Sequence, residues 1–363
     1  MKIGLIGLSS TGKTTLFNLL TNSIDHSSIP TTKRMEPHLG VARIPDKRID
    51  FLATKYKPRK TIYATIDVTD IRGITPEGNT KKEAGPDNFL ESVRQTDALV
   101  HVVRAFHNDD VIHMEGTIDP LRDIDSVNME LLFADLAVIE NRIHKIETSK
   151  KMTKEMAEEL EVLKKCRGCL ESEKLIHSLE LTDDEKQYIK TFQFLTERPL
   201  VLLVNLDEDQ FRSSKYENRE KLIKYAAERD IPMFEISART EFEISRLDAE
   251  DKMLFMEDLG IKDTGISRLA NLMYNYLGLI SFLTVGEDEV RAWTVRKGIT
   301  AKAAGGRVHS DIERGFIRAE VFKYSDFERL KTVHALKEKG LFRLEGKDYI
   351  IEDGDIINFR FNV

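Results

Sequence analysis

Cysteine is scarce in this chain. Only two cysteines occur in 363 residues, which excludes the disulfide framework of small secreted domains. The pair, Cys166 and Cys169, has C-x-x-C spacing, but a zinc site needs two more ligands and only His177 is close in the sequence. We therefore expect two ordinary thiols one turn apart on a helix, in a protein of the reduced cytosol.

Long hydrophobic runs are absent as well. No apolar stretch approaches the ~18 residues of a membrane-spanning helix, so no membrane partner is expected. The first apolar run, Ile3 to Gly7, is too short for the core of a signal peptide, and Ser9, Ser10 and Lys13 interrupt its continuation. We interpret this run as a buried strand of a cytoplasmic protein.

Neither sign of charge is in large excess. The formal net charge of −7 argues against a protein coated in nucleic acid but permits a local basic patch. With 41% hydrophobic and 32% charged residues, the composition is that of a globular protein. A length of 363 residues is too great for one simple core and predicts two or three domains.

Short apolar runs separated by helical patterns fill much of the chain. This alternation is typical of a mostly parallel sheet with helices on both faces. The predicted strands span residues 2–7, 62–68, 98–104, 200–204 and 232–236. The sequence therefore predicts an α/β fold with a doubly wound sheet.

The alternation is broken between about residues 125 and 195, where a heptad pattern appears. Apolar residues follow one another at intervals of four and three at Leu132, Leu136, Ile139, Ile143 and Ile146, and again at Met156, Leu160 and Leu163. A polar turn from Thr148 separates the two sets, which predicts an antiparallel helical hairpin. Two amphipathic helices lying on the sheet would give the same pattern. The apolar face that these heptads form could pack within one chain or between two chains; we expect a monomer.

The composition changes again at Ser281. Short β-rich runs punctuated by glycines follow, at residues 291–295, 317–321, 348–351 and 356–361. They predict a separate small α+β module at the C-terminal end.

The strongest motif is a phosphate-binding loop, Gly7-Leu-Ser-Ser-Thr-Gly12-Lys13-Thr14, which matches G-x-x-x-x-G-K-[ST] between a predicted strand and a predicted helix. Its glycines let backbone N–H groups and the helix N-terminus face the phosphates. Lys13 would bring charge to the β- and γ-phosphates during catalysis, and the Thr14 hydroxyl would ligate Mg²⁺. The predicted phosphate-binding residues are Gly7, Ser10, Thr11, Gly12, Lys13, Thr14 and Thr15.

A second motif, Asp70-Ile-Arg-Gly73, ends the run that begins near residue 62. In a P-loop protein such an aspartate holds Mg²⁺ through its water shell, and the glycine N–H can reach the γ-phosphate. Alone the four-residue pattern carries little weight. At the end of a second strand it supports Asp70 and Thr14 as the metal site.

Base recognition is predicted in two loops. Asn205-Leu206-Asp-Glu208 follows a strand where GTPases carry N-K-x-D, and Ser237-Ala238 follows the next strand. In N-K-x-D the aspartate accepts hydrogen bonds from guanine, whereas a glutamate is one methylene longer and would overreach. Adenine presents an acceptor at N1 that a carboxylate repels, so selectivity would rest on Asn205 and main-chain groups.

Together these motifs resemble the Obg-like ATPase family, also called YchF. The resemblance extends over essentially the whole chain. The matching stretches are His101-Val-Val-Arg-Ala-Phe-His-Asn-Asp-Asp110, His113-Met-Glu-Gly116, Asp119-Pro-Leu-Arg-Asp123, Glu289-Val-Arg-Ala-Trp293-Thr, Glu313-Arg-Gly-Phe-Ile-Arg-Ala-Glu320, Leu344-Glu-Gly-Lys-Asp-Tyr349 and Phe359-Arg-Phe-Asn-Val363.

The resemblance implies three parts: a GTPase-like ATPase domain at 1–124 and 196–280, an inserted coiled coil at 125–195, and a TGS domain of β-grasp form at 281–363. It also makes N-x-x-E a mark of ATP preference. Where Ras-like enzymes have a water-aligning glutamine the family has an apolar residue, which Ile74 matches, and the histidine proposed to assist hydrolysis falls on His113.

Three positions depart from the family pattern. Ser9-Ser10-Thr11 replace Pro-Asn-Val in the P-loop. Arg34 stands where a threonine two residues before Glu36-Pro37 would complete the Mg²⁺ shell, with Thr31 and Thr32 displaced, and Asp70-Ile-Arg-Gly replaces D-I-A-G. These changes bear on the rate and switching of hydrolysis rather than on binding, and they fit a divergent paralogue.

We therefore expect a Mg²⁺-dependent nucleoside triphosphatase that binds and slowly hydrolyses ATP in preference to GTP, with a ribosome or structured RNA as partner. A nucleotide-holding scaffold that does not hydrolyse, or an authentic GTPase, are the alternatives. The predicted partner surface lies between Val290 and Ser310, where no acidic residue occurs and Trp293 is expected to be buried. Its basic residues are Arg291, Arg296, Lys297, Lys302 and Arg307. The hairpin tip near Lys150 and Lys151 is the other candidate contact.

Overall fold

The computed structural model describes residues 1–22, 38–73 and 86–362. The chain folds into two compact units, Met1–Val41 with Asp67–Ile266 and Ala42–Ile66 with Ser267–Val363. Across the described residues, no helix combines the length and apolarity that crossing a membrane requires. The residues discussed above around the missing Mg²⁺-shell threonine, and the residue at the water-aligning position, lie outside the described part; they are Thr31, Thr32, Arg34, Glu36, Pro37 and Ile74.

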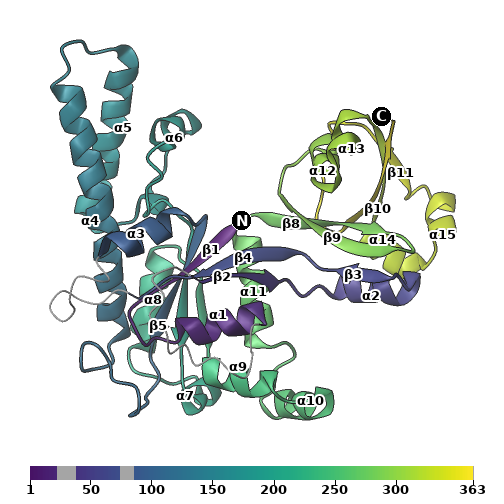
Figure 1. The fold of residues 1–363 in the computed structure, drawn as a ribbon, viewed down its shortest axis with the longest axis horizontal. Coiled ribbons are helices and arrows are strands. Elements are labelled where there is room, and N and C mark those ends of the chain that lie inside the picture. Colours follow the sequence, from purple (N-terminus) through teal and green to yellow (C-terminus); the bar gives the residue numbers. More distant parts are fainter. Residues whose placement is uncertain (23–37, 74–85, 363) are drawn as a thin grey trace. The chain divides into compact units, whose positions relative to one another are not determined.

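A six-stranded sheet forms the centre of the first unit (Figure 1). Its order is β2–β4–β1–β5–β6–β7, and the pairs from β4 to β7 are parallel. The strands are β1 (Lys2–Ile6), β2 (His38–Arg43), β4 (Thr65–Asp70), β5 (Ala98–Arg104), β6 (Leu200–Asn205) and β7 (Met233–Ile236). Every residue of β5 and β6 is buried, as expected for parallel strands covered on both faces. The predicted α/β class is confirmed.

Helices pack against this sheet. Apolar side chains of α3 (Pro86–Arg94), the first turns of α4 (Pro120–Glu147) and α8 (Arg219–Glu228) form one core with side chains of β5 and β6. The helices α1 (Lys13–Thr21) and α9 (Ala238–Ser245) contact each other. The unit also contains α7 (Glu208–Ser213) and α10 (Ala249–Asp258).

The carboxyl ends of the parallel strands meet at one edge of the sheet, which is where ligands bind in such folds. The P-loop follows β1, Asp70 ends β4, Asn205 ends β6, and Ser237 follows β7. Strand order therefore gathers four predicted segments that lie far apart in the sequence.

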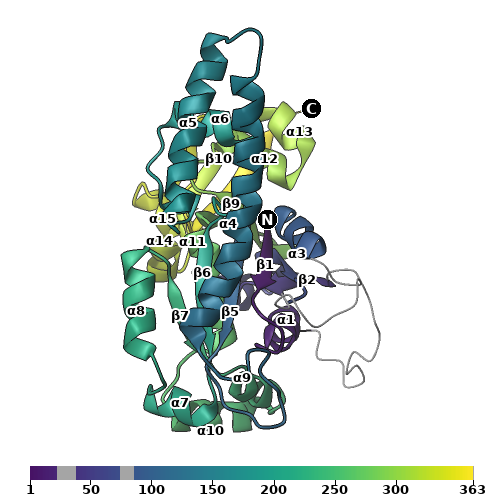
Figure 2. The same cartoon turned by 90° about the vertical axis from the view of Figure 1, so that its left-hand side faces the viewer.

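The predicted helical hairpin is present. The second half of α4 and α5 (Lys154–Glu171) lie side by side, with α6 (Asp183–Ile189) against α5 (Figure 2). Their shared core contains Leu132, Ile139, Ile143, Ile146, Leu160 and Leu163, with Leu136 and Met156 partly buried against it. Because the first turns of α4 pack on the sheet instead, the alternative of helices lying on the sheet holds for that part alone. Both cysteines lie on α5.

A second six-stranded sheet forms the other unit, in the order β11–β10–β12–β8–β9–β3. Its strands are β3 (Lys60–Ile62), β8 (Leu279–Val285), β9 (Glu289–Arg296), β10 (Phe316–Lys323), β11 (Arg343–Glu345) and β12 (Asp355–Phe361). Its helices are α2 (Lys47–Tyr56), most of α11 (Gly265–Tyr276), α12 (Ala301–Val308), α13 (Ser310–Arg314), α14 (Tyr324–Leu330) and α15 (Val333–Glu338). The predicted small α+β module thus forms around a core that includes Phe282, Val321 and Phe359.

Two predicted strands differ in the structure. Residues 348–351 make only an isolated bridge, Thr300 to Ile350, because this segment bonds to the loop before α12 rather than to a strand. The run 62–68 is divided between β3 and β4, since residues 60–62 pair with β9 and residues 67–70 pair with β1. One apolar run therefore serves two sheets.

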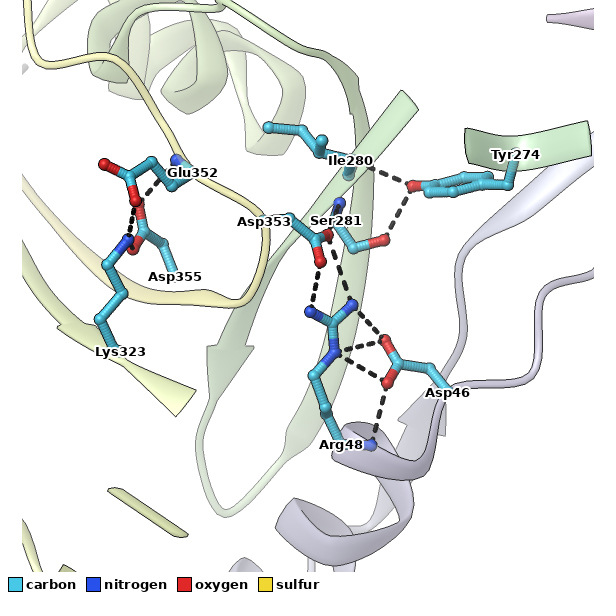
Figure 3. Close-up of polar contacts among 9 residues, drawn as sticks. All are labelled: Asp46, Arg48, Tyr274, Ile280, Ser281, Lys323, Glu352, Asp353 and Asp355. Atoms are coloured by element: carbon cyan, nitrogen blue, oxygen red, sulfur yellow. Dashed lines mark hydrogen bonds and ion pairs between the residues drawn. The ribbon is translucent and has the colours of Figure 1, made fainter. Parts of the chain in front are cut away.

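Residues 42–66 belong to the second unit, whereas the division made from the sequence placed them in the nucleotide-binding domain. Arg48 fixes this segment to the C-terminal sheet (Figure 3). Its guanidinium lies 2.8 Å from an oxygen of Asp46, the N-cap of α2, and 2.6 Å from one of Asp353. Asp353 in turn accepts a hydrogen bond from the Ser281 N–H (2.8 Å). The chain therefore leaves the first unit near the end of β2 and returns within β4, which ends at Asp70.

Candidate nucleotide-binding site

The backbone of the P-loop requires glycine at two positions. Gly7 and Gly12 have φ angles of 140° and 97°, which L side chains rarely adopt. A Cβ on Gly7 would lie 2.3 Å from the Val102 carbonyl oxygen, and one on Gly12 would lie 2.3 Å from Asn205 Nδ2. Ser10, with φ of 63°, takes a left-handed conformation without being glycine. The loop is thus curled tightly against β5 and β6.

Lys13 is the first residue of α1 and is almost fully buried. Its Nζ donates hydrogen bonds to the carbonyl oxygens of Gly7 (3.2 Å) and Leu8 (2.5 Å). Burial lowers the pKa of Lys13 to about 8, against the opposing effect of the Asp70 carboxylate. The ammonium therefore lies inside the curl of the loop, where a phosphate would compensate the cost of burying its charge.

Thr14 and Asp70, the predicted magnesium ligands, contact each other. The Thr14 hydroxyl donates to Asp70 Oδ2 over 2.7 Å, and burial raises the pKa of Asp70 despite this bond and nearby Lys13. Mg²⁺ prefers oxygen ligands and takes only one or two from protein when phosphates supply others. The Thr14 hydroxyl and the Asp70 carboxylate are oxygen ligands of this kind, so the two side chains fit Mg²⁺ that is held mainly by a nucleotide. No three His, Cys, Asp or Glu side chains gather into a metal site in the described parts of the chain.

Gly73 lies against the P-loop. A Cβ there would come within 2.7 Å of the Ser9 backbone nitrogen and 2.8 Å of Lys13 Nζ. Its main chain is consequently close to the Lys13 ammonium. That the Gly73 N–H reaches the γ-phosphate, as in a D-x-x-G motif, stays a prediction.

The remaining P-loop residues are placed differently from one another. Thr11 is buried, and its hydroxyl donates to the Leu8 carbonyl oxygen (3.1 Å), which stabilises the loop itself. The Thr15 side chain is exposed on the first turn of α1, where it is open to a ligand.

The Asn205 side chain joins two loops of the site. Its Nδ2 donates to the Thr11 carbonyl oxygen (3.0 Å), and its Oδ1 accepts from the Ala238 N–H (3.0 Å). Both ends of this buried amide are thus engaged within the protein. In this structure Asn205 holds the P-loop and the loop after β7 in register rather than presenting a free amide to a base.

The other residues predicted to contact the base differ in how exposed their side chains are. Leu206 is buried in the core, so only its main chain could face a ligand. Ser237 is the buried N-cap of α9 and bonds to Thr240. Glu208, the first residue of α7, is partly exposed and pairs with Arg212 over 3.0 Å. It is the one acidic side chain among these residues that a base could approach.

His113 lies in the loop between β5 and α4, with both ring nitrogens in contact. Nε2 is 2.9 Å from Asp123 Oδ2, and Nδ1 accepts from the Glu115 N–H over 3.2 Å. Arg122 and Asp123 belong to a stretch that carries the family resemblance, but the sequence predicted no role for either residue. The one local signal of structure next to them is the N-cap and proline at residues 119–120, which predict that a helix starts there.

Comparisons with known proteins agree with this geometry. A family model described as a 50S ribosome-binding GTPase matches residues 2–237. Residues 279–362 match a second model, YchF-GTPase_C, described as a protein of unknown function.

Individual relatives match over the full length. The ribosome-binding ATPase YchF of Haemophilus influenzae is 43% identical over 100% of this chain and 99% of its own. That of Bacillus subtilis is 40% identical over 99% of each chain. The structure of the YchF GTPase of Schizosaccharomyces pombe superposes with a TM-score of 0.87 at 32% identity, covering 99% of this chain and 97% of the other.

Proposed function

Since this chain belongs to the YchF family, we propose that it binds ATP in preference to GTP, hydrolyses it slowly with Mg²⁺, and associates with the ribosome according to its nucleotide state. The observation that carries the proposal is that Asp70 and Gly73 lie against Thr14 and Lys13 of the P-loop. When bound, Mg²⁺ would neutralise charge on the terminal phosphates. The chain's own residues bind and orient: Lys13 brings a cation, and Thr14 and Asp70 supply oxygens.

A scaffold that holds nucleotide without hydrolysing it is a second candidate. The observation in its favour is that His113, the proposed aid to hydrolysis, has both ring nitrogens occupied. Measured turnover of ATP by the purified chain separates the two. Multiple turnovers that depend on Mg²⁺ support the ATPase, and binding without turnover supports the scaffold.

Glu208 supports the preference for ATP. We expect tighter binding of ATP than of GTP in isothermal titration, and we expect Glu208→Asp to shift the ratio of the two affinities toward GTP. The shorter carboxylate could accept hydrogen bonds from guanine N1–H and its amino group. The lysine of N-K-x-D is left out of the variant because a lysine at the buried position 206 would have to lose its hydration.

Asp209→Glu is the matched control, since Asp209 is the exposed neighbour of Glu208 and should leave the ratio unchanged. A wild-type affinity for GTP tenfold above that for ATP (about 1.4 kcal/mol) would overturn the assignment. In that case the chain would be an authentic GTPase.

The basic surface of the second unit supports a ribosomal RNA partner. Arg296, Lys297, Lys302 and Arg307 are exposed and make no ion pair with another described residue. Lys347, also exposed, joins them because the Lys302 N–H bonds to its carbonyl oxygen (3.2 Å). We name these five residues the cationic patch.

Arg291 does not belong to the cationic patch. Its guanidinium lies 3.8 Å from the centre of the Trp293 ring, and it pairs with Glu289. Trp293 packs against the core, stacks with Phe282 and donates from Nε1 to the Thr284 hydroxyl (3.0 Å). It is partly buried, whereas the sequence predicted burial. The TGS-like β-grasp assignment of this unit, and the status of the chain as a divergent paralogue, are parts of the same proposal.

The cationic patch predicts salt-dependent ribosome binding. Changing Arg296, Lys297 and Lys302 together to glutamate should reduce co-sedimentation with ribosomes at low salt, and the wild-type protein should dissociate steeply as salt rises, because phosphate contacts release counterions. A charge-matched control changes Lys331, Lys337 and Lys339 together to glutamate; these three lysines are exposed in or next to α14 and α15. Equal pelleting of wild type and patch variant would move the contact to the hairpin tip near Lys150 and Lys151.

A further inference from the structure

The loop before α4 folds back so that the His113 side chain is buried while its apolar neighbours Ile112 and Met114 are exposed. The side chains of His113 and Asp123 are 7% and 2% exposed, whereas Ile112, next to the histidine, is 84% exposed. Burial of apolar surface would favour the opposite arrangement. The polar contact between His113 and Asp123 therefore holds the histidine against α4 although its neighbour Ile112 stays exposed.

Asp123 is fixed from its other side. Arg122 donates from Nε (3.2 Å) and Nη2 (2.9 Å) to Asp123 Oδ1. The same guanidinium donates to the hydroxyl (3.0 Å) and the carbonyl oxygen (2.7 Å) of Thr117. One carboxylate oxygen is thus held by a cation, and the other, Oδ2, is aimed at His113.

The two contacts of the imidazole agree on a single tautomer. A carboxylate paired with a guanidinium only accepts hydrogen bonds, so His113 Nε2 must carry a proton to bond with it. Nδ1 accepts the backbone N–H of Glu115, so Nδ1 has the lone pair. The neutral ring is therefore protonated at Nε2.

We propose that Asp123 is a positioning residue for His113, which fixes the Nε2–H tautomer and leaves Nδ1 as the proton-accepting atom. This inference rests on the proposed part of His113 in hydrolysis. Of the two ring contacts, the bond from Glu115 is longer and involves no charge, and it lies in a turn at Gly116, whose φ is 76°. Opening that bond frees Nδ1 for water while Asp123 keeps the ring oriented.

A buried carboxylate that orients a histidine can contribute several orders of magnitude to a rate, since the wrong tautomer offers a proton where an acceptor is needed. In full-length Asp123→Asn, the amide can donate to Nε2 and favour the Nδ1–H tautomer. We expect kcat for ATP to fall at least ~10-fold and the Kd for ATP to stay within about twofold. Asp123→Glu, which keeps the carboxylate, should recover part of the loss.

The tautomer itself is measured by ¹⁵N NMR of labelled histidine. We expect Nε2–H at His113 in the wild type and a shift toward Nδ1–H in Asp123→Asn. Asp125→Asn is the matched control, because Asp125 is an exposed aspartate on the same helix that makes no contact with His113 in the structure. It should change neither kcat nor the spectrum.

Three results would overturn the inference. The first is a wild-type His113 protonated at Nδ1, and the second is an unchanged kcat in Asp123→Asn although His113→Ala lowers kcat. The third is a kcat of Asp123→Asn above that of the wild type. The last would make the contact a restraint on the loop. If His113→Ala keeps the wild-type rate, the catalytic part of the proposed function fails instead, and the spectrum still decides whether Asp123 sets the tautomer. Should Asp123→Asn not fold, the wild-type spectrum and Asp123→Glu provide the test.

Discussion

Lys13→Ala should weaken ATP binding by more than ~100-fold, or about 2.7 kcal/mol. Lys13 Nζ lies inside the curl of the P-loop, within hydrogen-bond distance of the Gly7 and Leu8 carbonyl oxygens. Burial lowers its pKa to about 8, so the buried ammonium has a desolvation cost when no anion is present. A bound phosphate would offset that cost. Isothermal titration with ATP and Mg²⁺ measures the loss.

The control for this variant is Lys221→Ala. Lys221 is an exposed lysine of α8 in the same unit, and its removal should leave the affinity unchanged. Circular dichroism of both variants establishes that they are folded. Binding of ATP by folded Lys13→Ala with wild-type affinity would exclude the P-loop as the nucleotide site.

His113→Ala should leave ATP affinity intact and lower turnover by ~10² or more, the usual contribution of a positioned acid–base or water-orienting side chain. The expected split between Kd and kcat follows from the structure, because His113 contacts Asp123 and Glu115 and makes no hydrogen bond to the P-loop. Single-turnover hydrolysis at saturating ATP measures the chemical step apart from product release.

His107→Ala is the control for this second variant. His107 lies in the same loop between β5 and α4 with its side chain exposed. Its substitution should preserve turnover. Hydrolysis by His113→Ala at the wild-type rate would leave His113 a structural residue that fastens the loop to α4.

Some functional residues could be predicted because their signals are local. The P-loop motif spans residues 7–14, and the same few residues create both the curl and the helix N-terminus. The hairpin was predictable for a similar reason, since heptad spacing on one helix is enough to define its buried stripe.

Asn205 shows where local prediction stops. Its position after a strand correctly placed it at the carboxyl edge of the sheet. The use of its amide, however, depends on Thr11 and Ala238, which are 194 and 33 residues away. Asp123 is similar: its burial against His113 depends on how the loop between them folds back, for which the sequence has no periodic signal.

The sequence by itself determined that this chain has a phosphate-binding loop, an α/β sheet behind it, a helical hairpin and a C-terminal α+β module. Each of these is encoded by spacing within a few turns of chain, where steric limits and burial of one face act on neighbouring residues. Only the tertiary structure decided that residues 42–66 join the C-terminal unit and that one apolar run serves two sheets. Which strands pair depends on the free energy of burying surfaces from segments that are distant in the sequence. A short stretch of sequence specifies only one of the two surfaces, so it does not determine the pairing.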